Sequence, residues 1–94
     1  MELRYSARAQ RDLLDGSINW RVHHPGRPDL FDDKIVKALE LLSEQPRMGR
    51  ATNRYRNGRV LVLVDIEHLL FYRVHRNYIA VLAILPARAQ RRPL

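Results

Sequence analysis

The chain has 94 residues and no cysteine, which excludes disulfide bonds, thiolate metal sites and cysteine nucleophiles. Its net charge of +7 is unevenly placed: residues 1–45 hold seven Lys/Arg against eight Asp/Glu, whereas residues 46–94 hold ten Arg, no Lys and two acids. A second half with a net charge of +8 favours a polyanion or an acidic polypeptide as partner, and arginine pairs bidentately with carboxylate or phosphate. The alternative is an arginine-rich face that only contacts solvent.

The length predicts one domain over residues 1–94, because autonomous domains hold roughly 100–150 residues. The amino terminus lacks a basic segment followed by an apolar one, which argues against a secretory signal. The longest apolar run, residues 60–64, is too short to cross a bilayer. We therefore expect a soluble, cytoplasmic protein.

The first half of the chain predicts a short strand and two helices. Residues 2–5 alternate weakly as a strand, and Ser6 is a candidate N-cap for a helix from Ala7 to about Val22. Apolar residues at helical spacing predict the buried face of this helix: Leu14, Ile18 and Val22, widened by Leu13. Trp20 is expected to pack between the two helices.

A second helix is predicted from Pro28 or Asp29 to Gln45, after a segment rich in proline and glycine. Acidic residues near its start suit the positive end of the helix dipole. Its apolar stripe has a period of 3.6 residues and comprises Phe31, Ile35, Ala38, Leu39 and Leu42. We expect the two helices to pair as a hairpin.

Three consecutive antiparallel strands are predicted at residues 60–64, 69–74 and 79–85, joined by turns at 65–68 and 76–77. The sequence therefore predicts an α+β fold of order β-α-α-β-β-β, with the helical hairpin packed on a small antiparallel sheet. The apolar runs alternate little, which suggests that both sheet faces are covered. The helices cover one face, so a partner is expected to cover part of the other.

This order of elements resembles the ParE/RelE toxin superfamily. The resemblance rests on four motifs in order: residues 5–13 at the strand–helix junction, residues 39–49 with Pro46 and Gly49 after leucines, the Phe-Tyr-Arg-Val of residues 71–74, and the strand 79–85. It implies the toxin of a type II toxin–antitoxin module, held by a cognate antitoxin that is acidic in its toxin-binding segment. Such pairs form heterotetramers or larger assemblies, and DNA is contacted only through the antitoxin.

The resemblance leaves the mode of action open. Ribonuclease members carry a histidine or tyrosine just past the last strand, where this chain has Pro86-Ala87-Arg88. This departure favours a ParE-like toxin that inhibits DNA gyrase or another topoisomerase by binding, and so it favours a protein that is not an enzyme. The alternative is a RelE-like, metal-independent, ribosome-dependent mRNA endoribonuclease, with its phosphate charge stabilised by Arg59, Arg73 and Arg88 and its proton transfer supplied by His68 or His75. A plain nucleic-acid-binding module is a third reading.

Arginines are the candidate antitoxin- or target-binding residues. They comprise a loop group with Tyr55 interleaved, two strand residues and a basic tail over residues 86–94: Arg50, Arg54, Arg56, Arg59, Arg73, Arg88, Arg91 and Arg92. Tyr72 and Arg73 should point to opposite sheet faces, with Tyr72 in the core and Arg73 facing a groove or an acid, where Arg59 could join it. The paired histidines His23 and His24 lack the spacing of metal ligands, so we expect no metal and no cofactor.

Overall fold

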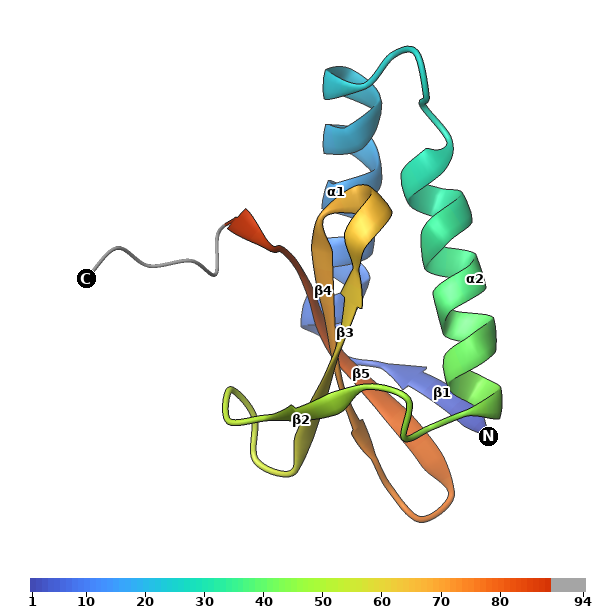
Figure 1. The fold of residues 1–94 in the computed structure, drawn as a ribbon, viewed down its shortest axis with the longest axis vertical. Helices are drawn as coiled ribbons and strands as arrows, with labels where there is room; N and C mark the ends of the chain where they lie inside the picture. Colours follow the sequence, from blue (N-terminus) through green and yellow to red (C-terminus); the bar gives the residue numbers. More distant parts are fainter. Residues whose placement is uncertain (89–94) are drawn as a thin grey trace, which may run out of the picture.

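The computed structural model describes residues 1–88, in which two helices cover one face of a five-stranded sheet (Figure 1). The elements in chain order are β1 (Glu2–Tyr5), α1 (Ala7–His23), α2 (Leu30–Glu44), β2 (Arg50–Thr52), β3 (Gly58–Leu63), the 3-10 turn η1 (Val64–Ile66), β4 (His68–Val74) and β5 (Tyr78–Pro86). In the sheet order β1-β5-β4-β3-β2, β1 runs parallel to β5 and the other pairs are antiparallel. The predicted α+β class and the helical hairpin are confirmed.

The strand β2 is an addition to the predicted order. It has only three residues, Arg50–Thr52, and pairs with the first half of β3. The segment shows neither an apolar alternation nor a run of β-branched residues, so the sequence offered no strand signal there. Its pairing with β3 is a tertiary contact, which local propensity does not record.

The ends of α1 follow the sequence closely. Ser6 caps the helix, because its Oγ accepts a hydrogen bond from the Ala9 amide at 2.9 Å. Trp20 is buried near the other end, where its indole Nε1–H donates to the carbonyl of Arg27 at 2.8 Å. No helix within residues 1–88 is long and apolar enough to span a membrane.

The predicted buried face of α1 is wrong. Leu14, Ile18 and Val22 are 63%, 55% and 69% exposed. Of the predicted face only Leu13 packs on the core, and the helix packs through a line comprising Ala9, Leu13, Gly16 and Trp20. A Cβ on Gly16 would lie 2.5 Å from Cζ of Phe31, so this line lets α1 approach α2 closely. Both lines have helical spacing, and hydrophobicity alone selects the wrong one.

The second helix buries the face that was predicted for it. Phe31, Ile35, Ala38 and Leu42 are buried, and Leu39 packs against them. Together with the buried line of α1 they cover five residues of the sheet: Leu70, Tyr72, Ile79, Val81 and Ile84. The core therefore lies between the helical hairpin and the central strands β4 and β5.

The opposite face of the sheet carries a second, smaller apolar cluster. Its buried members are Val60, Phe71, Ala83 and Leu85, joined by the partly buried Tyr55, Leu69 and Leu82. Tyr55 comes from the loop between β2 and β3, and its ring centroid lies 5.4 Å from that of Phe71. The chain's own loop thus covers part of the face for which a partner was expected.

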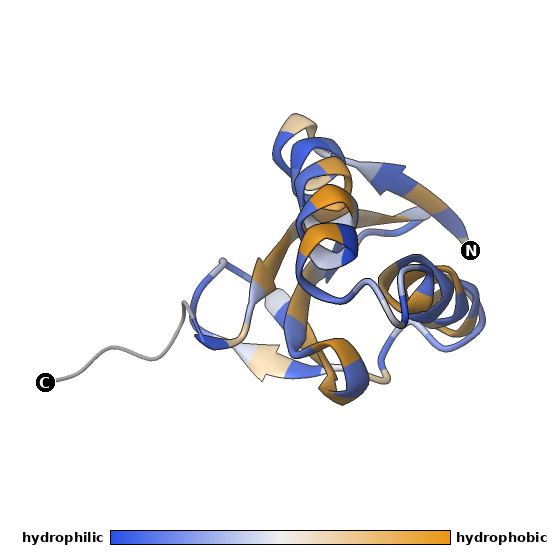
Figure 2. Ribbon diagram, turned by 90° about the horizontal axis from the view of Figure 1, so that it is seen from above, coloured by the Kyte–Doolittle hydropathy of each residue, from blue (hydrophilic) through white to orange (hydrophobic). Residues whose placement is uncertain are grey.

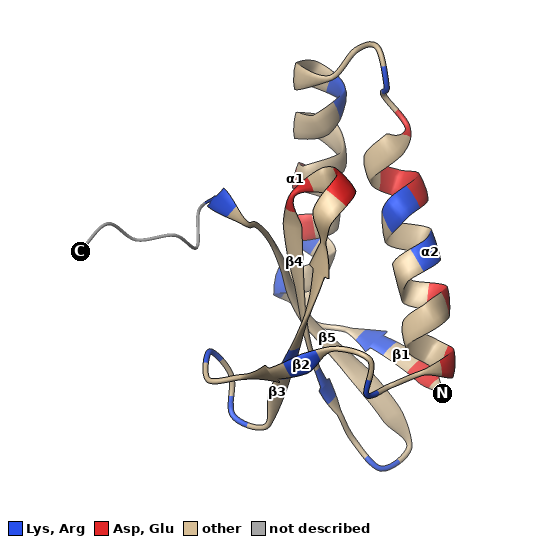
Figure 3. Ribbon diagram, viewed as in Figure 1, with Lys and Arg blue, Asp and Glu red and all other residues tan. Residues whose placement is uncertain are grey.

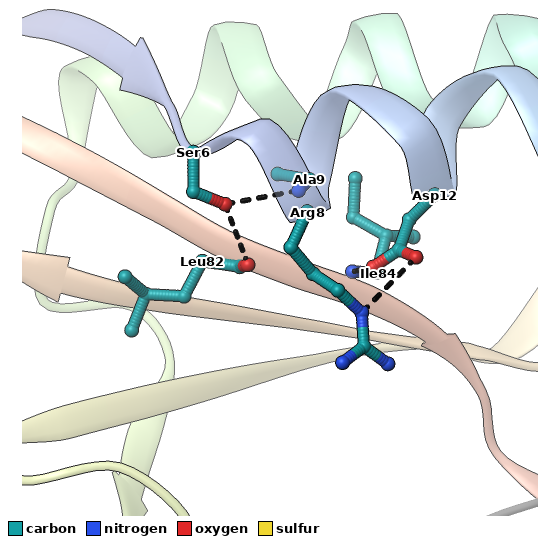
Figure 4. A network of polar contacts seen from close by, with 6 residues as sticks. All are labelled: Ser6, Arg8, Ala9, Asp12, Leu82 and Ile84. Atoms are coloured by element: carbon teal, nitrogen blue, oxygen red, sulfur yellow. Dashed lines mark hydrogen bonds and ion pairs between the residues drawn. The ribbon is translucent and has the colours of Figure 1, made fainter.

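A bulge in β5 fixes how α1 meets the sheet. Phe71 pairs with Ala83 and Tyr72 pairs with Val81, so Leu82 is the extra residue. Ser6 Oγ donates to the carbonyl of Leu82 at 2.8 Å, and Asp12 Oδ2 accepts from the amide of Ile84 at 2.9 Å (Figure 4). Because β1 pairs with β5 only as far as Val81, the first two turns of α1 take the place of a strand partner for these backbone groups of β5.

Substituting Asp12 tests this contact. Asp12→Ala leaves the Ile84 amide without its acceptor, so the free energy of unfolding should fall by about 1–3 kcal/mol. Asp12→Asn keeps a side-chain oxygen and should lose clearly less. Urea unfolding at neutral pH measures both, with the exposed Asp15→Ala as control. Equal losses for Asp12→Ala and Asp15→Ala would show that the contact does not stabilise the fold.

Candidate functional site

The sheet face that the helices leave uncovered gathers arginines. Cross-strand partners share a face, and Arg4 pairs with Ala80, which in turn pairs with Arg73. Arg50 pairs with Val60, a member of the apolar cluster on this same face. We define the arginine face as these three residues and two more from the loop between β2 and β3: Arg4, Arg50, Arg54, Arg56 and Arg73.

The loop between β2 and β3 folds back onto the sheet for local reasons. Asn57 takes a left-handed conformation (φ 53°), which asparagine tolerates well, and the Gly58 amide donates to the carbonyl of Tyr55 at 2.9 Å. A Cβ on Gly58 would lie 2.9 Å from Cβ of Tyr55, so glycine permits the close return. The turn places Tyr55 and its neighbouring arginines over β4.

Rings and carbonyls hold most of these guanidinium groups. Arg54 lies over the ring of Phe71 at 5.4 Å, and Arg4 lies over the ring of Tyr78 at 4.0 Å. Arg73 Nε donates to the carbonyl of Arg56 at 2.7 Å, so it meets neither of the partners expected for it, a groove or an acid. These contacts position the arginines without neutralising their charge.

Acidic residues are scarce on this face. Within residues 1–88, Arg4 is the only member of the arginine face with an ion pair, a 2.8 Å contact to Glu2. Figure 3 shows the acidic residues gathered on the helices and around η1, whereas β2, its following loop and the turn after β4 carry basic residues. The electrostatic field of this face is therefore positive and suits an anionic partner.

Arg59 does not join Arg73. It pairs with Tyr72, so it points to the helix side of the sheet, whereas Arg73 points to the other side. Arg59 Nη1 donates to the carbonyl of Gly49 at 2.7 Å and, more weakly, to that of Arg47 at 3.4 Å. The expectation that the two arginines share one site is wrong, because adjacent strand positions alternate between faces.

Tyr72 anchors the same segment from inside the core. Its side chain is fully buried, and its hydroxyl accepts a hydrogen bond from the Gly49 amide at 2.8 Å. Burial raises the pKa of Tyr72 above its ordinary value, and the Gly49 amide and the charge of Arg59 offset part of that rise. Gly49 is thus held through both its amide and its carbonyl, which fixes where β2 begins.

The two histidines proposed for proton transfer lie at opposite ends of β4. His68 Nδ1 lies 2.7 Å from the carbonyl of Ile66, and its ring meets Phe31 edge-on, with centroids 5.0 Å apart. His75 stacks on Tyr78 at 4.5 Å. The alternative ribonuclease set is therefore divided between two ends and two faces of the sheet.

One part of that set does come together. His68 and Arg88 line a pocket of about 460 Å³ with other polar residues, namely Asn19, His23, His24 and Glu67. Within residues 1–88, no group of three or more His, Cys, Asp or Glu is placed to hold a metal ion. The tail residues Arg91 and Arg92 lie outside the described residues.

Sequence reasoning missed a groove between α2 and the outer edge of β3. It has a volume of about 300 Å³ and is lined by Leu41, Met48, Leu61, Val62, Val64 and the lysines Lys34 and Lys37, among others. The strand β2 pairs only with Gly58–Val60, so the edge of β3 beyond Val60 has no strand partner among residues 1–88. Lys34 contacts Asp65 at 2.8 Å and holds the pKa of that carboxyl below its ordinary value. The available sequence signal was the uninterrupted apolar run of residues 60–64, two of whose members, Val62 and Val64, are exposed.

Comparison with known proteins gives a consistent result. A family model described as "ParE toxin of type II toxin-antitoxin system, parDE" matches residues 3–91. Among solved structures, 11 chains match, including one titled "Chromosomal ParDE TA system from P. aeruginosa". That chain is 22% identical, with a TM-score of 0.77, and the match covers 92% of the present chain and 95% of the other. No curated protein sequence matches.

Replacing Tyr72 tests its role as an anchor. Tyr72→Phe leaves the buried Gly49 amide without an acceptor and should lower the free energy of unfolding by about 1–3 kcal/mol at pH 7. Because its pKa is raised in the folded state, Tyr72 stabilises the fold below about pH 10, and this stability is lost as the pH rises further. Denaturant titrations from pH 7 to 11 should therefore show a shallower alkaline loss for Tyr72→Phe than for the native protein.

Tyr55→Phe is the control for that titration, because Tyr55 lies on the other sheet face and is only partly buried. An alkaline loss as steep in Tyr72→Phe as in the native protein would contradict the assignment.

Proposed function

The chain belongs to the ParE family of toxins from type II toxin–antitoxin systems, and we propose that it arrests growth by binding DNA gyrase and is neutralised by a cognate antitoxin. The observation that carries the proposal is the arginine face. Five arginines lie on the sheet face opposite the helices, and two of them lie over aromatic rings. Within residues 1–88, only one of the five, Arg4, forms an ion pair with an acid. Such a surface binds an anionic partner through charge and planar contacts.

Binding, rather than cleavage, is favoured by how the titratable groups are arranged. Cleavage of RNA needs a base, an acid and cations around one phosphate. Here His75 stacks on Tyr78 at one end of β4, His68 lies at the other end, and Arg59 holds a backbone carbonyl on the helix side. Binding to a partner through the arginine face needs no such arrangement of an acid, a base and cations. We propose that the toxin acts in the cytoplasm.

An antitoxin segment that carries both apolar and acidic residues fits two adjoining surfaces of the toxin. The groove between α2 and β3 offers apolar side chains and an unpaired strand edge, which can take up an extended segment by strand addition. The flanking β2 begins at Arg50, so the same segment can continue onto the arginine face with acidic residues. We propose that one antitoxin chain covers both surfaces in a heterotetramer or larger assembly.

Charge reversal on the arginine face tests the proposed action. Controlled expression in bacteria should arrest growth with a DNA-damage response while translation continues. Arg54→Glu with Arg73→Glu should raise the expression level needed for arrest at least about tenfold, since the face is then no longer basic. A double variant of equal net charge, Arg27→Glu with Arg11→Glu, changes exposed arginines of the helical hairpin and should still arrest growth.

The ribonuclease alternative predicts different results in the same experiment. Its support is the pocket that His68 shares with Arg88. Rapid loss of translation, cleavage of ribosome-bound mRNA and relief of arrest by His68→Ala would replace the gyrase proposal with that activity. Arrest that survives both His68→Ala and His75→Ala excludes these histidines as proton donors.

A substitution in the groove tests the proposed antitoxin site. Val62 is 45% exposed on the edge of β3, and Val62→Asp places a charged carboxylate in the apolar part of the groove. Co-purification with the cognate antitoxin should weaken at least about tenfold. The matched control is Val36→Asp on α2, which replaces another exposed valine with the same residue. Equal retention of the antitoxin by both variants would place its site elsewhere.

A further inference from the structure

The helix side of the sheet carries a second group of arginines, at the end where β3 begins and β4 ends. Two hollows of about 590 and 310 Å³ adjoin there, and Arg47 and Val74 line both of them. Val74 packs against the core, so both hollows lie on the helix side. His75 and Arg76, from the turn after β4, line the larger hollow, and Arg59 from β3 lines the smaller one. We define the basic end as Arg47, Arg59, His75 and Arg76.

The chain does not neutralise the guanidinium groups of the basic end. Among residues 1–88, none of these three arginines forms an ion pair, and no Asp or Glu lines either hollow. Glu44, the acid nearest to Arg47 in sequence, lines a separate hollow. Arg59 holds backbone carbonyls through Nη1 alone, so its Nε–H and Nη2–H donors make no hydrogen bond within residues 1–88. The basic end therefore offers both charge and donors to an anion.

Arginines surround this end of the sheet on its other face as well. Arg73 pairs with Gly58, the first residue of β3, and donates to the carbonyl of Arg56 in the loop. Figure 3 shows that the basic residues before β2, in the loop after it and in the turn after β4 lie at one end of the molecule. The basic end and this part of the arginine face thus lie back to back across the sheet, and positive charge extends over both faces.

We propose that the basic end binds the phosphate backbone of double-stranded DNA. A duplex carries one negative charge per about 1.7 Å of its axis, distributed over two strands, and so presents phosphates to a basic surface that continues around the end of a sheet. Guanidinium groups bind phosphate through paired N–H donors as well as through charge. The resemblance to toxins of this superfamily implied DNA contact only through the antitoxin, and the basic end adds a direct contact by the toxin.

The surfaces that suit a protein partner lie elsewhere on the chain. Protein interfaces bury a centre that is rich in apolar side chains. The most exposed large apolar residues, Val64, Val22 and Leu14, belong to η1 and α1, and Figure 2 shows hydrophobic segments on both elements. In Figure 1, η1 and the last turns of α1 lie at the opposite end of the molecule from the turn after β4. Charge is therefore the property that distinguishes the basic end.

The aromatic rings at this end favour a duplex over a single strand. Single-stranded nucleic acid is bound by stacking its bases on exposed rings. Here the rings of His75 and Tyr78 stack on each other at 4.5 Å, and Arg4 lies over the ring of Tyr78 at 4.0 Å. These contacts use ring faces that bases would need. Contacts between guanidinium and phosphate carry no sequence information, so we expect binding that does not depend on DNA sequence.

Binding of DNA to the purified toxin tests the proposal. The anisotropy of a fluorescent duplex of about 20 base pairs should give a dissociation constant of roughly 1–100 µM at physiological salt, whatever its sequence. Arg47→Gln with Arg76→Gln removes two exposed charges. The slope of log K against log salt should become shallower by about 2, because each phosphate contact contributes about 0.9. At about 50 mM salt the affinity should fall at least about tenfold.

Two matched variants separate the basic end from general charge and from stability. Arg11→Gln with Arg27→Gln lowers the net charge equally through exposed arginines of the helical hairpin, and it should retain the native slope. Arg47→Lys with Arg76→Lys keeps both charges and should retain most of the slope. The urea unfolding midpoint should stay close to the native value in all three variants, since these side chains are exposed.

Four results would overturn the proposal. An unchanged slope in Arg47→Gln with Arg76→Gln would show that the basic end does not contact DNA. A slope that falls only in Arg54→Gln with Arg73→Gln would place the contact on the arginine face alone. Tighter binding of polyglutamate than of the duplex would assign the basic end to an acidic protein, and tighter binding of a single-stranded oligonucleotide would exclude the duplex as its ligand.

The DNA contact and the proposed action on gyrase are tested separately. The anisotropy titration contains no gyrase, so its failure leaves growth arrest through the arginine face unaffected. Conversely, expression that fails to arrest growth would remove the gyrase proposal without changing the affinity of the purified toxin for DNA.

Discussion

The attachment of α1 to the bulged strand β5 is the contact on which the rest of the structure depends. Ser6 caps the helix and also donates to the carbonyl of Leu82, and Asp12 accepts from the amide of Ile84. These bonds fix both the position and the direction of α1 over the sheet. Because Leu82 is the extra residue of the bulge, Val81 and Ile84 both face the helices, and the buried faces of the helices meet a continuous apolar surface.

Placing both helices on one face decides where the chain's charges lie. Acids concentrate on the helices and around η1, whereas four arginines of the second half, Arg50, Arg54, Arg56 and Arg73, lie on the other side of the sheet. Tyr55 covers the apolar centre of that face, so its rim can be basic without exposing Phe71. The charge asymmetry of the sequence thus becomes an asymmetry between two sides of the sheet, which is the property that a partner can recognise.

The sequence was sufficient for the class of fold and insufficient for the choice of faces. The boundaries of the predicted strands and helices follow from caps, turns and periodicity, as at Ser6, and they agree with the structure to within about two residues, whereas β2 was not predicted. The faces depend on packing: α1 buries the line containing Gly16 because small residues permit close approach, although Leu14 and Ile18 are more apolar. Arg59 and Arg73 were grouped because both are strand arginines, and only the register with β4 shows that they point apart. The groove beside β3 exists because β2 pairs only with Gly58–Val60 and leaves the rest of that edge open. The extent of this pairing is a tertiary feature, which local sequence patterns do not record.

The arginine face and the groove have consequences for how toxin and antitoxin could assemble. The two surfaces adjoin each other through β2, so under the proposed function one antitoxin chain covers both and thereby blocks the surface that would bind the target. The exposed apolar residues of α1, Leu14, Ile18 and Val22, lie on the helical side and stay free in that arrangement.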